Sequence, residues 1–196
     1  MALSLKKGES LSLTKRDGGA LTRTRLGLGW DSAAPVKRGI FGSRKAAEVD
    51  LDASAIFFDA NGRAVDSIWY GQLASKDGST RHTGDNVTGA GDGDDEVILV
   101  DLTKVSPAVT QIVFVISSYT GQSFDLVQNA FCRLVDDSTS GSPEIARYEL
   151  TDAGTHTAMI MAKVTRDGAG WTFKAIGDRA TGRTVADLVP HASRAL

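Results

Sequence analysis

Short segments that alternate apolar and polar residues recur along almost the whole chain, separated by turn-forming dipeptides. In Leu21–Trp30 the even-numbered residues form the more apolar face, which we expect to face the core. Asn61-Gly62 and Asp167-Gly168 each separate two such segments and predict hairpins. No helical crossovers join the segments, so the pattern favours antiparallel sheets over an α/β fold.

The segments that we expect to form strands are 3–14, 21–30, 56–59, 64–70, 96–102, 112–116, 131–135, 144–150, 159–165 and 171–176. The run Ile112–Ile116 is apolar throughout and rich in β-branched residues, which is typical of a central strand buried on both faces. Short helices are expected only at 123–129 and 184–189. The sequence therefore predicts an all-β fold, a two-sheet antiparallel β-sandwich with one or two short helices.

Length and composition favour a single domain over residues 1–196. The chain is 41% hydrophobic and 23% charged, which suits one sizeable core. Two parts differ from the rest: a basic loop insertion at 32–48, and a C-terminal tail or short helix at 181–196. We interpret the basic loop as a solvated insertion, with a docking surface for an anionic partner or a membrane as the alternative.

Cysteine usage and charge limit the compartment and the partners. Cys132 is the single cysteine, so an intrachain disulfide is excluded and a reducing compartment is favoured. We find neither a signal-peptide pattern nor an apolar run long enough to span a bilayer, so we expect a cytoplasmic protein. A formal net charge of -2 gives no reason to expect nucleic acid as a partner.

Residues 84–96 carry the most unusual composition of the chain. Five carboxylates, one carboxamide and four glycines occur there without Lys or Arg. Carboxylates this close repel one another unless they are fully solvated, take up protons or bind a cation. Glycines let a backbone curl so that several oxygens converge, as the six to eight oxygen ligands of calcium require. We therefore predict a calcium site, with a solvated acidic loop as the alternative.

The alternation of an extended chain suggests how the ligands divide. Asp92, Asp94 and Glu96 would share one face and Asp95 the other, which makes two ion positions possible. The remaining ligands would come from Asp85, from the amide oxygen of Asn86 and from backbone carbonyls such as that of Gly91. A second pair of carboxylates, Asp50 and Asp52, would point the same way about 7 Å apart on a strand.

Other chemistries fit the acidic stretch less well. An EF-hand needs glycine where Ala90 stands and helices where the flanks are predicted strands. Magnesium prefers few protein ligands, and zinc would require His or Cys, of which only His82 is near. Two functional alternatives stay open: a metal-dependent hydrolase with His82 as the base, and a scaffold whose acidic loop binds a basic protein segment.

Several stretches together resemble the TerD family of tellurium-resistance and stress-response proteins, in order from about residue 1 to residue 180. The stretches that carry the resemblance are Leu5-Lys6-Lys7-Gly8-Glu9, Gly27-Leu28-Gly29-Trp30-Asp31, Asp50-Leu51-Asp52-Ala53-Ser54-Ala55, His82-Thr83-Gly84-Asp85-Asn86-Val87-Thr88-Gly89-Ala90-Gly91-Asp92-Gly93-Asp94-Asp95-Glu96 and Asn129-Ala130-Phe131-Cys132-Arg133-Leu134-Val135. The loop after Trp30-Asp31 is longer and more basic than is usual in the family.

The resemblance implies a two-sheet β-sandwich that binds calcium, expected here as two ions, and that has no established enzymatic activity. It also implies a cytoplasmic stress-response system. We expect protein partners from the same system, with a peripheral association with a membrane complex as a further candidate. The metal-binding role carries over to Asp85, Asn86, Asp92, Asp94, Asp95 and Glu96, with Asp31, Asp50 and Asp52 as supporting carboxylates.

Overall fold

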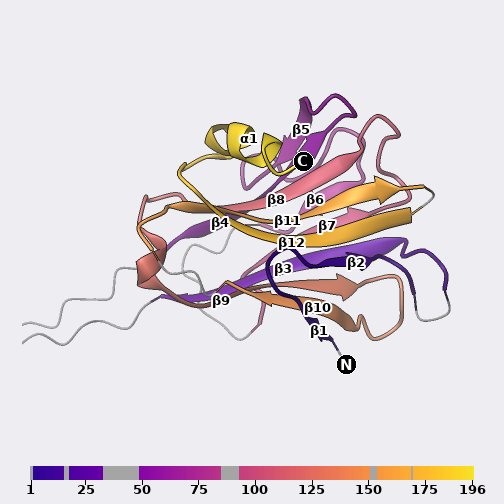
Figure 1. Cartoon of the computed structure of the whole chain (residues 1–196), viewed down its shortest axis with the longest axis horizontal. Helices are drawn as coiled ribbons and strands as arrows, with labels where there is room; N and C mark the ends of the chain where they lie inside the picture. Colours follow the sequence, from indigo (N-terminus) through magenta and orange to yellow (C-terminus); the bar gives the residue numbers. More distant parts are fainter. Residues whose placement is uncertain (1, 16–17, 33–48, 85–92, 151–153, 169) are drawn as a thin grey trace, which may run out of the picture.

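Two six-stranded sheets stack face to face, as Figure 1 shows. The computed structural model describes residues 2–15, 18–32, 49–84, 93–150, 154–168 and 170–196. Sheet A contains, in spatial order, β1 (Leu3–Ser4), β10 (Glu144–Glu149), β9 (Val127–Asp136), β3 (Arg23–Ser32), β7 (Glu96–Asp101) and β6 (Thr80–His82). Sheet B contains β2 (Ser10–Ser12), β12 (Gly170–Ala180), β11 (Ala158–Asp167), β8 (Gln111–Ser118), β4 (Leu51–Phe58) and β5 (Ala64–Ile68).

The predicted two-sheet sandwich is confirmed. All pairings between named strands are antiparallel except that of β1 with β10, which is parallel. Both predicted hairpins form: β4 pairs with β5 across Asn61-Gly62, and β11 pairs with β12 across Asp167-Gly168. Gly62 and Gly168 have φ angles of 72° and 56°, a left-handed conformation that glycine adopts without steric cost.

The alternation of the strands produces a main core between the sheets and a smaller one outside sheet B. Leu26, Leu28 and Trp30 of β3 face the interior, as the sequence predicted. On β8, Ile112 and its even-numbered neighbours face the interior, whereas Val113 and Val115 contribute to the outer cluster. Strand β8 is therefore buried on both faces, as its continuous apolar run predicted.

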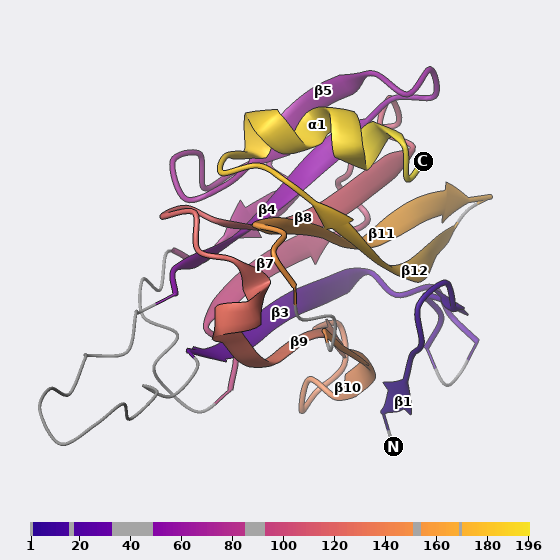
Figure 2. The same ribbon diagram turned by 60° about the vertical axis from the view of Figure 1, so that its left-hand side comes forward.

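A C-terminal helix covers part of the outer face of sheet B (Figure 2). This helix, α1 (Val185–Ser193), begins with a capping box between Thr184 and Asp187 and extends beyond the predicted 184–189. Among the described residues, no helix is long and apolar enough to cross a membrane.

The predicted helix at 123–129 is wrong except for one turn. A 3-10 helix, η1 (Phe124–Leu126), occupies that turn, and β9 begins at Val127. Pairing of β9 with β3 starts there, with Val127 opposite Ser32, and these inter-strand hydrogen bonds outweigh the weak local helical pattern. The predicted basic loop, apart from Ser32, lies outside the described residues.

Candidate metal centre

Asp31 and Asp95 line one hollow on the outer face of sheet A. The hollow has a volume of about 280 Å³, and Gly93, Asn129 and Arg147 also line it. Asp31 lies near the end of β3, where a β-bulge shifts the register between β3 and β9. On the bulged strand Asn129 adopts a φ of 51°, and its side-chain amide donates a hydrogen bond to Asp31 Oδ2 (2.8 Å).

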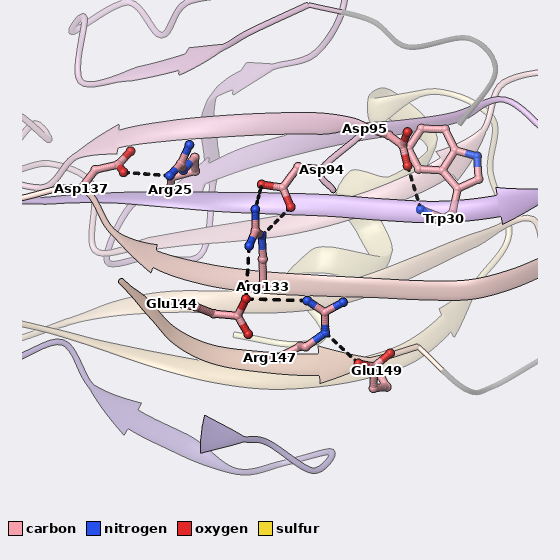
Figure 3. Close-up of polar contacts among 9 residues, drawn as sticks. All are labelled: Arg25, Trp30, Asp94, Asp95, Arg133, Asp137, Glu144, Arg147 and Glu149. Carbon is pink, nitrogen blue, oxygen red and sulfur yellow. Dashed lines mark hydrogen bonds and ion pairs between the residues drawn. The ribbon is translucent and has the colours of Figure 1, made fainter. Parts of the chain in front are cut away.

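Asp95 is held against β3 by two hydrogen bonds. Its backbone N–H donates to the Leu28 carbonyl (2.7 Å), and its Oδ2 accepts from the Trp30 backbone N–H (2.9 Å; Figure 3). Burial raises the pKa of Asp95 above its ordinary value; the Trp30 N–H lowers it, and the negative charges of Asp31 and Asp94 raise it further. Ionised Asp95 therefore lies in an unfavourable field that a bound cation would relieve.

Asp94 is bound by a guanidinium group instead. Arg133 on β9 donates from Nε to Asp94 Oδ1 (2.6 Å) and from Nη2 to Oδ2 (3.0 Å), a bidentate pair. Arg133 also bonds Glu144 (3.2 Å), which continues the ion-pair network visible in Figure 3. The carboxylate of Asp94 lies directly over Gly27, where a side chain would overlap with it. Asp94 thus has its charge compensated by protein.

Glu96 points into the sandwich and connects the two sheets. It is fully buried, and its Oε2 accepts a hydrogen bond from the backbone N–H of Ala53 on β4 (2.6 Å). His82 on β6 lies beside it, with Nε2 3.4 Å from Glu96 Oε2 and 3.2 Å from the Ala53 carbonyl oxygen. Because Nδ1 accepts from the Gly84 N–H (3.1 Å), the neutral ring carries its proton on Nε2. Both side chains thus contact the backbone of the buried residue Ala53 on β4.

This arrangement gives His82 a structural role. Both ring nitrogens contact backbone groups, and the side chain is fully buried. A general base must reach a proton on a substrate, so the enclosed ring does not support the hydrolase alternative.

The expected division of ligands by alternation is wrong for Asp94. Glu96 faces the interior, whereas Asp94 lies on the outer face of sheet A with Arg133. The expectation assumed an extended chain from Asp92, but β7 begins only at Glu96, and Gly93 adopts a φ of 110°. Without a strand, side-chain alternation does not apply.

Asp50 and Asp52 lie on the sheet B side of the molecule. Asp52, a residue of β4, is buried and faces away from the interior, on the face of the strand opposite to Ala53 and Glu96. Among the described residues no three His, Cys, Asp or Glu side chains gather as a metal site. The predicted ligands Asp85, Asn86, Gly91 and Asp92 lie outside the described residues.

The donor types around the hollow fit a hard cation. Asp31 and Asp95 supply carboxylate oxygens, and the Gly93 carbonyl oxygen lies over Gly29, where an added Cβ would be only 2.6 Å away. Arg147 brings one positive charge, but Glu149 Oε1 lies 2.8 Å from its Nε and its guanidinium stacks over the Phe131 ring. Calcium needs more ligands than these, and the acidic residues that precede Gly93 are adjacent in sequence.

Comparison with known proteins identifies the family to which this architecture belongs. The TerD domain matches residues 1–191. This chain belongs to the TerD domain family. The TerD-family relative named tellurium resistance protein TerZ, from Serratia marcescens, is 42% identical over 191 residues, covering 95% of this chain and 94% of TerZ. Stress response protein SCP2 from Bacillus subtilis is 39% identical over 202 residues, covering 96% and 98%.

A solved structure shares the TerD fold. The crystal structure of a homologue of telluride resistance protein TerD from Streptomyces coelicolor superposes with a TM-score of 0.69 at 22% identity, covering 87% of this chain and 96% of the other. This similarity supports the two-sheet sandwich.

Sequence reasoning gave no role to three residues of this TerD domain that shape the hollow and its surroundings: Asn129, Arg133 and Arg147. They lie on β9 and β10, far along the chain from the carboxylates that they contact or flank. The one available signal was that Asn129 and Arg133 belong to a stretch that resembles the family. Only the pairing of β9 with β3 brings them to Asp31 and Asp94.

Proposed function

We propose that this protein is a calcium-binding module of a stress-response system of the tellurium-resistance type. Its TerD-family relatives are named for tellurium resistance and for stress responses, which supports the system to which we assign it. The proposed role is binding rather than catalysis, the proposed location is the cytoplasm, and the proposed partners are proteins of the same system.

The environment of Asp95 is the observation that carries the proposal. Its pKa is raised by burial and by the charges of Asp31 and Asp94, and it lines a hollow with Asp31 and Gly93. A divalent cation there would reverse this unfavourable field. Asp94 and Glu96 already bind Arg133 and Ala53, so we place Asp31, Asp95 and the Gly93 carbonyl first among the described ligands.

Residues of the acidic stretch before Gly93 complete the proposed site. Asp85, Asn86, Gly91 and Asp92 supply the remaining oxygen ligands in this proposal, and the second expected ion draws on the same stretch. Ion binding would then join segments that otherwise repel one another and fix the surface that a partner protein recognises.

Thermal unfolding in calcium, magnesium and chelator tests the proposal. At a calcium concentration 100 times the dissociation constant, binding adds about 2.7 kcal/mol to the free energy of unfolding. Asp95→Asn should remove most of this gain. The matched control is Asp178→Asn, because Asp178 forms an exposed ion pair with Lys7 elsewhere on the surface and its loss should leave the gain intact. Identical melting temperatures of the unmodified protein in all three solutions would refute calcium binding.

A further inference from the structure

The outer face of sheet B contains a cavity of about 480 Å³ that the proposed calcium site does not involve. Its walls come from β4, β8, the segment that follows β5, and the first turn of α1, which lies across this face in Figure 2. The hollow with Asp31 and Asp95 lies on the outer face of the other sheet, so the two sites are separated by the sandwich core.

The floor of the cavity is polar although it is buried. Asp52 is 4% exposed, and it pairs across the sheet with Ser117, which is 2% exposed; Ser54, at 3%, lies next on the same face of β4. Ser54 and Ser117 both line the cavity beside Asp52. A hydroxyl group can donate or accept a hydrogen bond, so both side chains suit a polar group inside the cavity.

The walls are aromatic. Trp69 and Tyr70 meet edge to face with ring centroids 4.7 Å apart, and Tyr70 meets Tyr119 in the same way at 5.6 Å. Gly71 makes room for this arrangement, because a side chain there would overlap with the Trp69 ring. Aromatic faces attract organic cations. A buried carboxylate beside them adds a negative charge that accepts charge-assisted hydrogen bonds.

The positively charged groups at the mouth of the cavity form hydrogen bonds within the protein. Arg183 is exposed, and its Nε donates to the Tyr119 carbonyl (2.9 Å). The backbone N–H groups of Arg183 and Thr184 both donate to Asp187 Oδ2 (3.0 Å each), so the start of α1 has its own carboxylate. Arg183 is exposed and Asp52 is buried, so solvent screens the charge of the guanidinium more strongly than that of the carboxylate.

We propose that this cavity binds a small organic ammonium ion. The ammonium group donates hydrogen bonds to Asp52, Ser54 and Ser117, and its aliphatic part packs against the Trp69 and Tyr119 rings. A calcium ion fits less well here, because Asp52 is the one acidic residue that lines the cavity within the described chain, and calcium requires several oxygen ligands.

Titration of the full-length protein with n-butylammonium, followed by calorimetry and tryptophan fluorescence, tests the proposal. The uncharged control is 1-butanol, which has nearly the same shape. We expect n-butylammonium to bind at least about tenfold more tightly than 1-butanol, because the alcohol lacks the charge that Asp52 and the rings attract. Equal binding of the two compounds, or no binding of either, would overturn the proposal.

Two variants locate the site. Asp52→Asn keeps the side-chain shape and should weaken n-butylammonium binding about tenfold. Gly71→Ala should displace the Trp69 ring and weaken binding with Asp52 intact, which keeps the test valid if Asp52→Asn fails to fold. Unchanged affinity in the folded variants would place the ammonium elsewhere and contradict the assignment.

Testing each variant with both calcium and n-butylammonium distinguishes this cavity from the calcium site. Asp52→Asn should leave the stabilisation by calcium unchanged, whereas Asp95→Asn should reduce that stabilisation and retain ammonium binding. Loss of the calcium response in Asp52→Asn would assign Asp52 to a metal site and overturn the ammonium proposal, with calcium binding itself still supported.

Discussion

The outer faces of the two sheets are stabilised by different interactions. On sheet B, Ile56 and Val113 of the sheet are fully buried in one cluster with Leu188 of α1. On sheet A, the ion pair of Asp94 with Arg133 lies over the bare backbone of Gly27. One face thus resembles a second hydrophobic core, and the other is a charged layer over a glycine.

This difference explains why the two proposed sites take different ligands. The apolar face can enclose a cavity with one buried carboxylate and aromatic walls, which suits an organic cation. The charged face keeps several carboxylates close together near solvent, which suits a hard metal ion. Each site follows from how its face is covered.

The largest expected effect tests the hydrophobic face. Leu188→Ala should lower the free energy of unfolding by about 3 kcal/mol, because it leaves a void in a fully buried cluster. Leu73→Ala, at a leucine that is 44% exposed, should change it by less than about 0.5 kcal/mol. Urea unfolding measures both. If Leu188→Ala lowered the free energy of unfolding as little as Leu73→Ala, α1 would contribute little to the stability of this face.

A smaller effect tests the charged face. Gly27→Ala should cost about 2 kcal/mol, because the new methyl group overlaps with the Asp94 carboxylate and displaces it from Arg133. In an Asp94→Ala background the methyl group has room, and the cost should fall below about 1 kcal/mol. Gly170→Ala is the matched control, since an added Cβ there meets only the Asp167 carbonyl oxygen at 3.7 Å. Purely additive costs in the double variant would contradict this account.

The smallest effect compares one carboxylate from each side as a function of pH. The pKa of Asp95 is raised in the folded protein, so its contribution to stability is present below the ordinary value of 3.8 and is lost as pH rises. The pKa of Asp187 is lowered, chiefly by the backbone hydrogen bond from Arg183 and then by the side-chain hydroxyl and backbone N–H of Thr184, so its contribution is present above 3.8 and is lost on acidification.

Chelator-treated variants would show the two signs. Relative to Asp95→Asn, the unmodified protein should become less stable as pH rises from below 3.8 to neutrality; relative to Asp187→Asn, it should become more stable. Unfolding titrations across this range measure both differences. Differences of the same sign for the two variants would contradict the opposite pKa shifts of Asp95 and Asp187.

Much of the fold could be predicted because its signals are local. The alternation in β3, the apolar run of β8 and the turns at Gly62 and Gly168 each act within a few residues. The acidic stretch 84–96 was also evident from composition. The helix expected at 123–129 failed because pairing of β9 with β3 decided that segment.

The candidate site depended on contacts between distant residues. Asp94 and Asp95 are neighbours in the chain, yet one binds Arg133 and the other lines the hollow with Asp31. Strand alternation and turns are short-range properties, so the residue order alone was enough to predict the sandwich, its hairpins and the concentration of carboxylates. Which carboxylate has its charge compensated depends on strand register and on where β7 begins, so it could be read only from contacts between distant strands.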